Sequence, residues 1–198
     1  MKKIICLLSL FLVFQSIQAD SFDKLKEKLR IANCMEYDFI SVIESDVFDS
    51  VDSTYGHAQI ANDGRYNISM GEEVYAYNLK QYFTYVIPNN QLIIEKGDES
   101  SNDDILFITK LDEFYKSYIL QPDSLYRLVK KENVIGEFPD SLIVRLNKKK
   151  QQFEEISFID INDELNRIIF LSQIYHQKCI DSLLMPIFPD SVERVNLK

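Results

Sequence analysis

The side chains best suited to catalysis or metal binding are two histidines, His57 and His176. Neither has a spacing to other polar residues that indicates a metal site or a catalytic triad. The sequence also lacks a phosphate-binding loop, a GxSxG nucleophile elbow and an HExxH zinc motif. Its acidic pairs fall in expected turns or charged faces: Asp103/Asp104, Glu72/Glu73 and Glu154/Glu155. We therefore predict that the protein is not an enzyme and holds no metal or cofactor.

The cysteines offer a different kind of chemistry. Cys34 and Cys179 remain if the N-terminal leader described below is removed, and they could form one disulfide in an oxidising compartment. A chain of this size can also bury enough core without a disulfide, so two free thiols stay possible. Neither cysteine has a CxxC partner or a nearby histidine for redox or metal chemistry.

Residues 1–19 have the pattern of a secretory signal peptide. Lys2 and Lys3 precede a short apolar run, residues 4–14, and small Ala19 stands at the expected cleavage point. The run is shorter than the ~20 apolar residues that span a bilayer. A retained membrane anchor is the alternative. We expect cleavage before Asp20 and export to the periplasm.

The remaining residues, 20–198, have the size of one domain. The leader contains two lysines and no acidic residue, so its removal takes the net charge from −9 to −11. A chain this acidic, with a single lysine run at 147–150, is a poor candidate for binding nucleic acid. We interpret that run as a solvated hairpin turn.

The elements that must position these residues are mostly strands. An amphipathic helix is expected over 21–33, with Phe22, Leu25, Leu29 and Ala32 on one face. Short strands rich in β-branched and aromatic residues follow, separated by turn-forming residues, and each glycine falls at or beside an expected break. Strands are expected at 37–45, 56–62, 64–70, 73–78, 82–87, 91–95, 124–131, 141–148, 153–161, 166–176 and 192–197. Residues 104–119 should form a helix and then a strand, and 179–188 a short segment before the last strand. This order predicts a single antiparallel sheet without βαβ units.

Aromatic side chains recur at alternate positions of these strands. Residues two apart share a face, which groups Tyr66 with Ile68 and Met70, Tyr75 with Tyr77, and Phe83 with Tyr85. Asn67 and Thr84 fall between them, on the polar face. An apolar sheet face must be covered, and two short helical segments are a thin cover. The rings could form an ordinary solid core or line a cavity.

The order of motifs resembles the LolA family of periplasmic lipoprotein carriers. It is carried by "LKEKLRIANCMEYDFIS", "GHAQIANDGRYNISMGEEVYAYN", "IPNNQLII", "FEEISFID" with "NRIIFLSQI", and "FPDSVERVNL", which together span nearly all of residues 20–198. The resemblance implies an incomplete, strongly curved antiparallel β-barrel, with short helices as a lid over an apolar cavity. It also implies a carrier that shields the acyl chains of lipoproteins, receives them from an ATP-driven release complex of the inner membrane and passes them to an outer-membrane acceptor, as a monomer.

Individual residues match the family pattern. Phe39 falls on a phenylalanine that faces the cavity. The expected acyl-chain cavity comprises Phe39, Ile60, Tyr66, Ile68, Met70, Tyr75, Tyr77, Phe83, Tyr85, Leu92 and Ile94, and the expected lid comprises Leu25, Leu29, Leu106 and Phe107. Asn62 and Asp63 replace a basic residue and a proline of the family, and Arg65 is a candidate gating residue. Two other classes remain: an exported module that senses a lipid or peptide on the same half-barrel, and a structural envelope protein with a solid core.

Overall fold

The computed structural model describes residues 20–97, 108–134 and 138–197. The predicted signal peptide therefore lies outside the described residues. The helices are α1 (Ser21–Ile31), α2 (Leu111–Phe114) and α3 (Asp181–Leu184). Within these ranges, no helix is long and apolar enough to cross a membrane.

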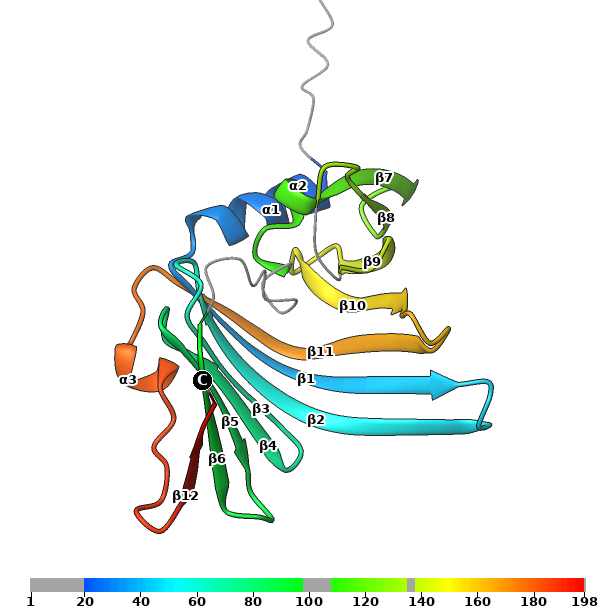
Figure 1. Ribbon diagram of the computed structural model, residues 1–198. Helices are drawn as coiled ribbons and strands as arrows, with labels where there is room; N and C mark the ends of the chain where they lie inside the picture. Colours follow the sequence, from blue (N-terminus) through cyan, green and yellow to red (C-terminus); the bar gives the residue numbers. More distant parts are fainter. Residues whose placement is uncertain (1–19, 98–107, 135–137, 198) are drawn as a thin grey trace, which may run out of the picture.

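Twelve strands form one continuous, strongly curved sheet (Figure 1). Their order across the sheet is β12-β6-β5-β4-β3-β2-β1-β11-β10-β9-β8-β7. The bounds are β1 (Cys34–Ser45), β2 (Ser50–Ala61), β3 (Tyr66–Met70), β4 (Glu73–Tyr77), β5 (Gln81–Val86), β6 (Gln91–Lys96), β7 (Tyr115–Gln121), β8 (Leu125–Lys130), β9 (Ser141–Asn147), β10 (Gln152–Ile159), β11 (Leu165–His176) and β12 (Glu193–Asn196). The ends do not pair with each other, so the sheet is an open half-barrel, as predicted.

Neighbouring strands are antiparallel with one exception. β12 runs parallel to β6, with Glu193 opposite Gln91 and Asn196 opposite Ile94. The prediction of a purely antiparallel sheet is wrong at this edge. After β11 the chain crosses to the far edge of the sheet, where β12 runs beside β6 in the same direction (Figure 1).

The predicted turns are present. β3 and β4 are joined through Gly71, whose φ of +59° suits a tight hairpin, and Gly64 in the preceding turn has a φ of +101°. Residues 147–150 lie at the β9–β10 turn, where the side chain of Asn147 accepts hydrogen bonds from the backbone N–H of Lys149 and Lys150. The prediction of a hairpin turn at the lysine run is confirmed.

One glycine departs from the sequence pattern. Gly56 lies inside β2 rather than at a break, opposite Phe39 of β1. A Cβ atom at Gly56 would stand 2.3 Å from Cζ of Phe39, which is closer than side-chain atoms can approach. Glycine is present here because the phenylalanine ring lies over the backbone of the neighbouring strand.

The inner face of the sheet carries the main core. Directly paired residues share a face, so Met35, Tyr37 and Phe39 of β1 lie with Ile60, Ala58 and Gly56 of β2. Further along, Leu128, Leu142, Val144 and Ile156 are fully or almost fully buried in the same cluster. This face is the one on which α1 packs.

Helix α1 begins at a strong cap. The carboxylate of Asp20 accepts hydrogen bonds from the backbone N–H of Phe22 and Asp23, at 2.8 and 2.9 Å. Phe22, Leu25 and Leu29 are buried, each contributing about 1.5–3 kcal/mol, and Phe22 stacks on Tyr126 of β8. The predicted helix and its apolar face are confirmed, although it ends two residues early, at Ile31.

The predicted helix-then-strand over 104–119 is present as α2 followed by β7. The expected lid residues Leu106 and Phe107 lie outside the described residues. Ile108 and Leu111, which come soon after them, are buried in the inner core.

Candidate apolar cavity and the outer-face cover

A cavity of about 310 Å³ lies on the inner face, over strands β1 to β4 and β11. Its lining residues are Tyr37, Phe39, Ser41, Ala58, Ile60, Ile68, Met70, Tyr75, Ile108, Ile168 and Phe170. Among these residues, Ile108 alone lies outside the sheet. This volume is typical of a small-ligand site. Without a charged side chain among these residues, the lining favours an apolar occupant.

Five of the predicted residues meet at this cavity. Phe39, Ile60, Ile68, Met70 and Tyr75 all line it. Ile68 and Tyr75 are direct partners in the β3–β4 ladder, which is why both point to the same side. The alternation of apolar residues in these strands thus corresponds to the face that lines the cavity.

Two more predicted residues share the inner face without lining the cavity. Tyr66 is buried in the core, 5% exposed, and Tyr77 packs against that core. Tyr77 stacks on Tyr82, with 4.4 Å between the ring centroids. These rings lie in packed core rather than in the cavity wall.

Phe83, Tyr85, Leu92 and Ile94 lie on the opposite, outer face, so their placement in the cavity is wrong. In the β4–β5 ladder, Ala76 pairs with Phe83, while Tyr75 pairs with Thr84. Thr84 therefore faces inward, contrary to the prediction, and Phe83 faces outward. Leu92 and Ile94 pair with Tyr85 and Phe83, which places them on the same outer face.

The outer-face aromatic residues are covered by the end of the chain. Phe188 packs against Phe83 and Tyr85, with ring centroids 6.1 and 5.7 Å apart. We call residues 177–197 the C-terminal strap, because they run across the outer face and end in β12. The strap buries Leu184 against Cys34 and Ala61.

The strap is fixed at its start by the Cys34–Cys179 disulfide, whose Cα atoms are 5.2 Å apart. The sequence allows these cysteines to be either free thiols or a disulfide, and in the structure they form the disulfide. Arg65 also contacts the strap: its guanidinium lies 2.7 Å from Asp181 and 2.9 Å from Asp63. This candidate gating residue therefore faces α3, on the outer face, and not the helices over the inner face.

Helix α1 covers a different part of the inner face from the cavity. Leu25 and Leu29, the two predicted lid residues that the structure describes, are buried in the core but do not line the cavity. Ile108 is the only lining residue, within the described ranges, that does not belong to the sheet. Among the described residues, Ile108 rather than α1 lies over the cavity.

The cavity edge carries one polar pair. The Tyr75 hydroxyl donates a hydrogen bond to the carboxylate of Glu73. Burial, together with this neighbouring carboxylate, raises the pKa of Tyr75 to about 12. Tyr75 is therefore neutral at physiological pH, and its hydroxyl is already occupied.

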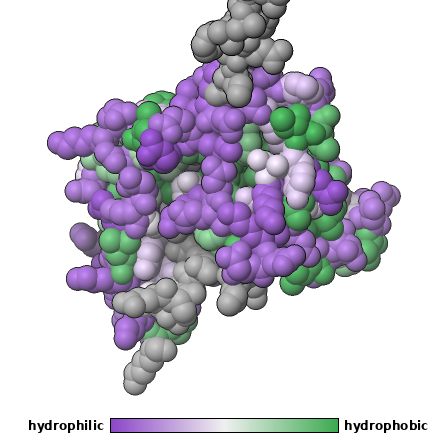
Figure 2. Space-filling model, turned by 90° about the horizontal axis from the view of Figure 1, so that it is seen from above, coloured by the Kyte–Doolittle hydropathy of each residue, from purple (hydrophilic) through white to green (hydrophobic). Residues whose placement is uncertain are grey.

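A larger hollow, of about 510 Å³, lies between α1 and residues 109–113. Its lining is mostly charged, and Lys26 bridges Asp23 and Asp112 across it at 2.9 and 3.2 Å. Because these charges satisfy one another, this hollow is a solvated cleft between two surface elements. Figure 2 shows that the face seen from above is largely hydrophilic, with hydrophobic side chains in separate patches.

Both histidines lie on the outer face beside a carboxylate. His57 Nδ1 is 2.8 Å from Asp38, and His176 Nε2 is 3.2 Å from Glu36. Asp38 also accepts hydrogen bonds from Ser172 and Tyr55. Serine, aspartate and histidine meet here, which the sequence spacing did not reveal because they come from three strands.

This cluster does not have the geometry of a catalytic triad. The Ser172 hydroxyl donates to Asp38 at 2.6 Å instead of to the imidazole of His57, so the base is not bonded to a nucleophile. Among the described residues, no group of three or more histidine, cysteine or acidic side chains could hold a metal ion.

The fold and cavity together define a class, an open half-barrel with an apolar inner pocket. No family model matches the sequence, and no curated protein matches it. The chain is similar in structure to an uncharacterized conserved protein from Thermus thermophilus, with 8% identity and a TM-score of 0.54 over 88% of this chain and 98% of that one. At this identity the likeness shows a shared fold.

Two further solved structures are similar at lower scores. One is the LolA superfamily protein NE2245 from Nitrosomonas europaea, with 7% identity and a TM-score of 0.43 over 85% of this chain and 99% of that one. The other is the MucA/MucB complex of Pseudomonas aeruginosa, with 11% identity and a TM-score of 0.35 over 84% of this chain and 59% of that one. At these identities and TM-scores neither likeness carries an argument about function, which is argued from the cavity itself.

Proposed function

We propose that this protein is a periplasmic carrier that holds the acyl chains of lipoproteins and shuttles them from the inner to the outer membrane. The observation that carries the proposal is the 310 Å³ inner cavity, with its apolar walls from β1 to β4 and β11. Apolar chains gain about 0.8 kcal/mol for each methylene removed from water, which suits a protein that must shield them in an aqueous compartment.

The size of the cavity supports one chain rather than several. If a methylene takes about the ~30 Å³ of a water molecule, the cavity holds on the order of ten such groups. The curved sheet supplies most of the cavity wall, and among the described residues Ile108 is the single lining residue outside the sheet. The proposed donor is an ATP-driven release complex of the inner membrane, and the proposed acceptor lies at the outer membrane.

The test begins with the protein purified from the periplasm of its native cell. Extraction with organic solvent and mass spectrometry should recover acyl-bearing lipoproteins or lipids. Depletion of the protein should then cause outer-membrane lipoproteins to accumulate at the inner membrane. An unchanged lipoprotein distribution would contradict the carrier function even if lipid is bound, and would instead favour a lipid-sensing module on the same fold.

A further inference from the structure

The two edges of the sheet are treated differently. At one edge the C-terminal strap supplies β12, which pairs with β6. At the other edge, β7 has a single strand neighbour, β8, within the described part of the chain. The outer edge of β7 therefore presents backbone N–H and C=O groups of the kind that pair with an added strand.

The side chains of β7 do little to discourage such pairing. Tyr118, Ile119 and Leu120 are 52%, 59% and 53% exposed. The strand contains no proline, and Lys116 is its one charged residue. Natural edge strands are usually shielded by charges, prolines or a covering element, so an exposed apolar edge indicates an interaction site.

The outer face beside this edge is basic, in a protein with a net charge of −9. Arg127 pairs with Tyr118 on one side and with Ile143 on the other, so these three side chains share that face. Lys116 precedes Tyr118 by two residues on β7, and Arg145 follows Ile143 by two residues on β9, so both lie on the same face. All three basic residues are exposed.

Within the described part of the chain, these charges are not neutralised by an acidic partner. Lys116, Arg127 and Arg145 form no ion pair with any residue in the described ranges. Glu155 stands opposite Arg145 in the β9–β10 ladder but makes no ion pair with it. Lys116 on β7 and Arg127 on β8 lie beside the open edge, with Arg145 one strand further in, and their positive charge favours an acidic ligand.

We propose that the β7 edge and this basic face together bind an extended, acidic segment of a partner polypeptide, which adds to the sheet as a further strand. Backbone pairing along β7 supplies the affinity. The basic residues select acidic side chains at alternate positions, because alternate residues of an added strand face the same side as Lys116 and Arg127. This surface is separate from the acyl-chain cavity, so it can be tested independently of the carrier function.

The probe is a short fluorescent peptide of alternating glutamate and valine, titrated into the whole protein and followed by anisotropy. We expect binding that weakens as salt rises, and that falls roughly tenfold or more in a Lys116→Glu, Arg127→Glu double variant. Lys80→Glu, on the exposed β4–β5 turn, is the matched control and should leave the affinity unchanged. Hydrogen exchange should show new protection at β7 when the peptide is bound.

Two control peptides test the pairing and the charge. The same peptide with alternate backbone nitrogens methylated cannot pair along one edge, and a lysine–valine peptide has the wrong charge. Equal binding of either control would overturn the proposal. A concentration-dependent dimer with β7 protected in the absence of peptide would overturn it as well, in favour of a second copy of this chain.

Discussion

The carboxylate of Asp38 accepts three hydrogen bonds on the outer face, from Ser172, His57 and Tyr55. These bonds lower the pKa of Asp38 to about 2, and the hydrogen bond from Ser172 has the largest effect. In the unfolded chain the pKa is about 3.9. Because the folded-state pKa is the lower one, the stabilisation is fully present above about pH 4 and is lost as the pH falls towards 2.

Replacing Asp38 with asparagine should therefore destabilise the protein in a pH-dependent way. We expect the free energy of unfolding to fall by on the order of 1 kcal/mol at pH 6, a modest value because the side chain is 32% exposed. Denaturant unfolding at pH 6 and at pH 3 measures the difference between wild type and Asp38→Asn. A difference that stays constant or grows on acidification would contradict the assigned pKa.

Residues show where sequence reasoning works and where it stops. The match to the family pattern places Phe39 facing the cavity, and Phe39 lines the cavity in the structure. The pattern puts Gly56 at a break, since glycine is common in turns, yet this residue lies under the Phe39 ring. Only the β1–β2 register brings the two residues together, and no local pattern encodes that register.

At the scale of elements, the C-terminal strap depends on its disulfide. Closing a loop with a sequence separation of 145 residues contributes about 5 kcal/mol in the chain-entropy model, which is an upper value because the strap is also held by β12 and Phe188. The double variant Cys34→Ser, Cys179→Ser should unfold at a lower denaturant concentration. Binding of an acyl probe should change little, because the bond lies on the outer face.

The matched control for this prediction is reductant. It should lower the stability of the wild type to that of the double variant and leave the double variant unaffected. Identical unfolding midpoints for oxidised and reduced wild type would contradict a stabilising disulfide.

The β4–β5 hairpin explains the main error in the predicted cavity. The turn after Tyr77 places Tyr75 opposite Thr84, so an odd-numbered residue of β4 pairs with an even-numbered residue of β5. A turn with one residue more or fewer would have put Phe83 on the inner face. The strand pattern predicts that one face of β5 is aromatic, but the turn decides which face that is.

The same limit applies to the outer-face cover. A strand that presents Phe83 and Tyr85 to solvent would be unfavourable, and the strap resolves this by placing Phe188 over them. Phe188 is far from both rings in the sequence, and its contact depends on the parallel pairing of β12. The final strand can be predicted from its residues, whereas its partner cannot.

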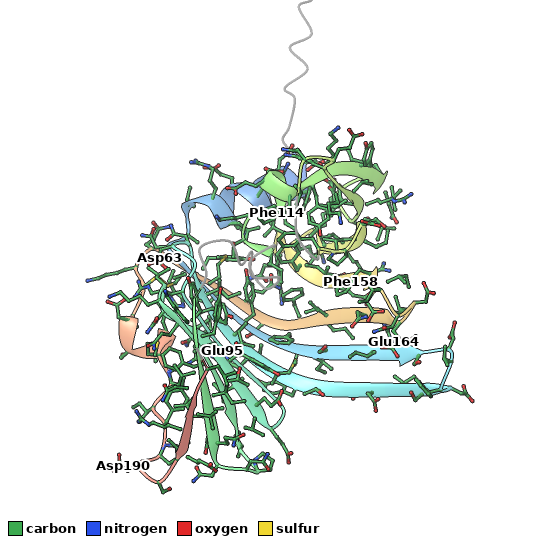
Figure 3. The ribbon with its side chains drawn as sticks, viewed as in Figure 1. Asp63, Glu95, Phe114, Phe158, Glu164 and Asp190 are labelled. Atoms are coloured by element: carbon green, nitrogen blue, oxygen red, sulfur yellow. A yellow bond between two sulfur atoms is a disulfide. The ribbon has the colours of Figure 1, made fainter. Side chains whose placement is uncertain are left out.

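At the scale of the whole molecule, two layers of apolar side chains lie on opposite faces of one sheet. The outer layer is closed by the strap, and the inner layer is a core that leaves a cavity beside it. Figure 3 shows Phe114 at the end of α2 and Phe158 on β10 on the side of the sheet where α1 lies, and Asp190 at the bottom of the view, where the strap turns into β12. The sheet thus separates the strap on its outer face from the cavity on its inner face. Among the described residues, Ile108 lies over that cavity.

This arrangement predicts how a buried charge would act. Tyr75→Asp would place a second carboxylate beside Glu73 in the cavity wall, where it must attract water or remain poorly solvated. We expect a protein that still folds, since a cavity has room for water, but that binds a fluorescent fatty-acyl probe roughly tenfold or more weakly. Thermal unfolding and probe titration measure the two effects separately.

Ser69→Asp is the matched control. Ser69 lies on β3, one residue from the cavity residue Ile68, but it is exposed and faces outward opposite Val74. The same added charge should there leave both the unfolding temperature and the probe affinity nearly unchanged. A solid core makes the opposite prediction: Tyr75→Asp would unfold the domain, and the wild type itself would bind no probe. That pair of results would defeat the carrier proposal. An acyl chain in the inner cavity must be displaced by a charge at Tyr75, in the cavity wall, and must be unaffected by a charge at Ser69, on the outer face.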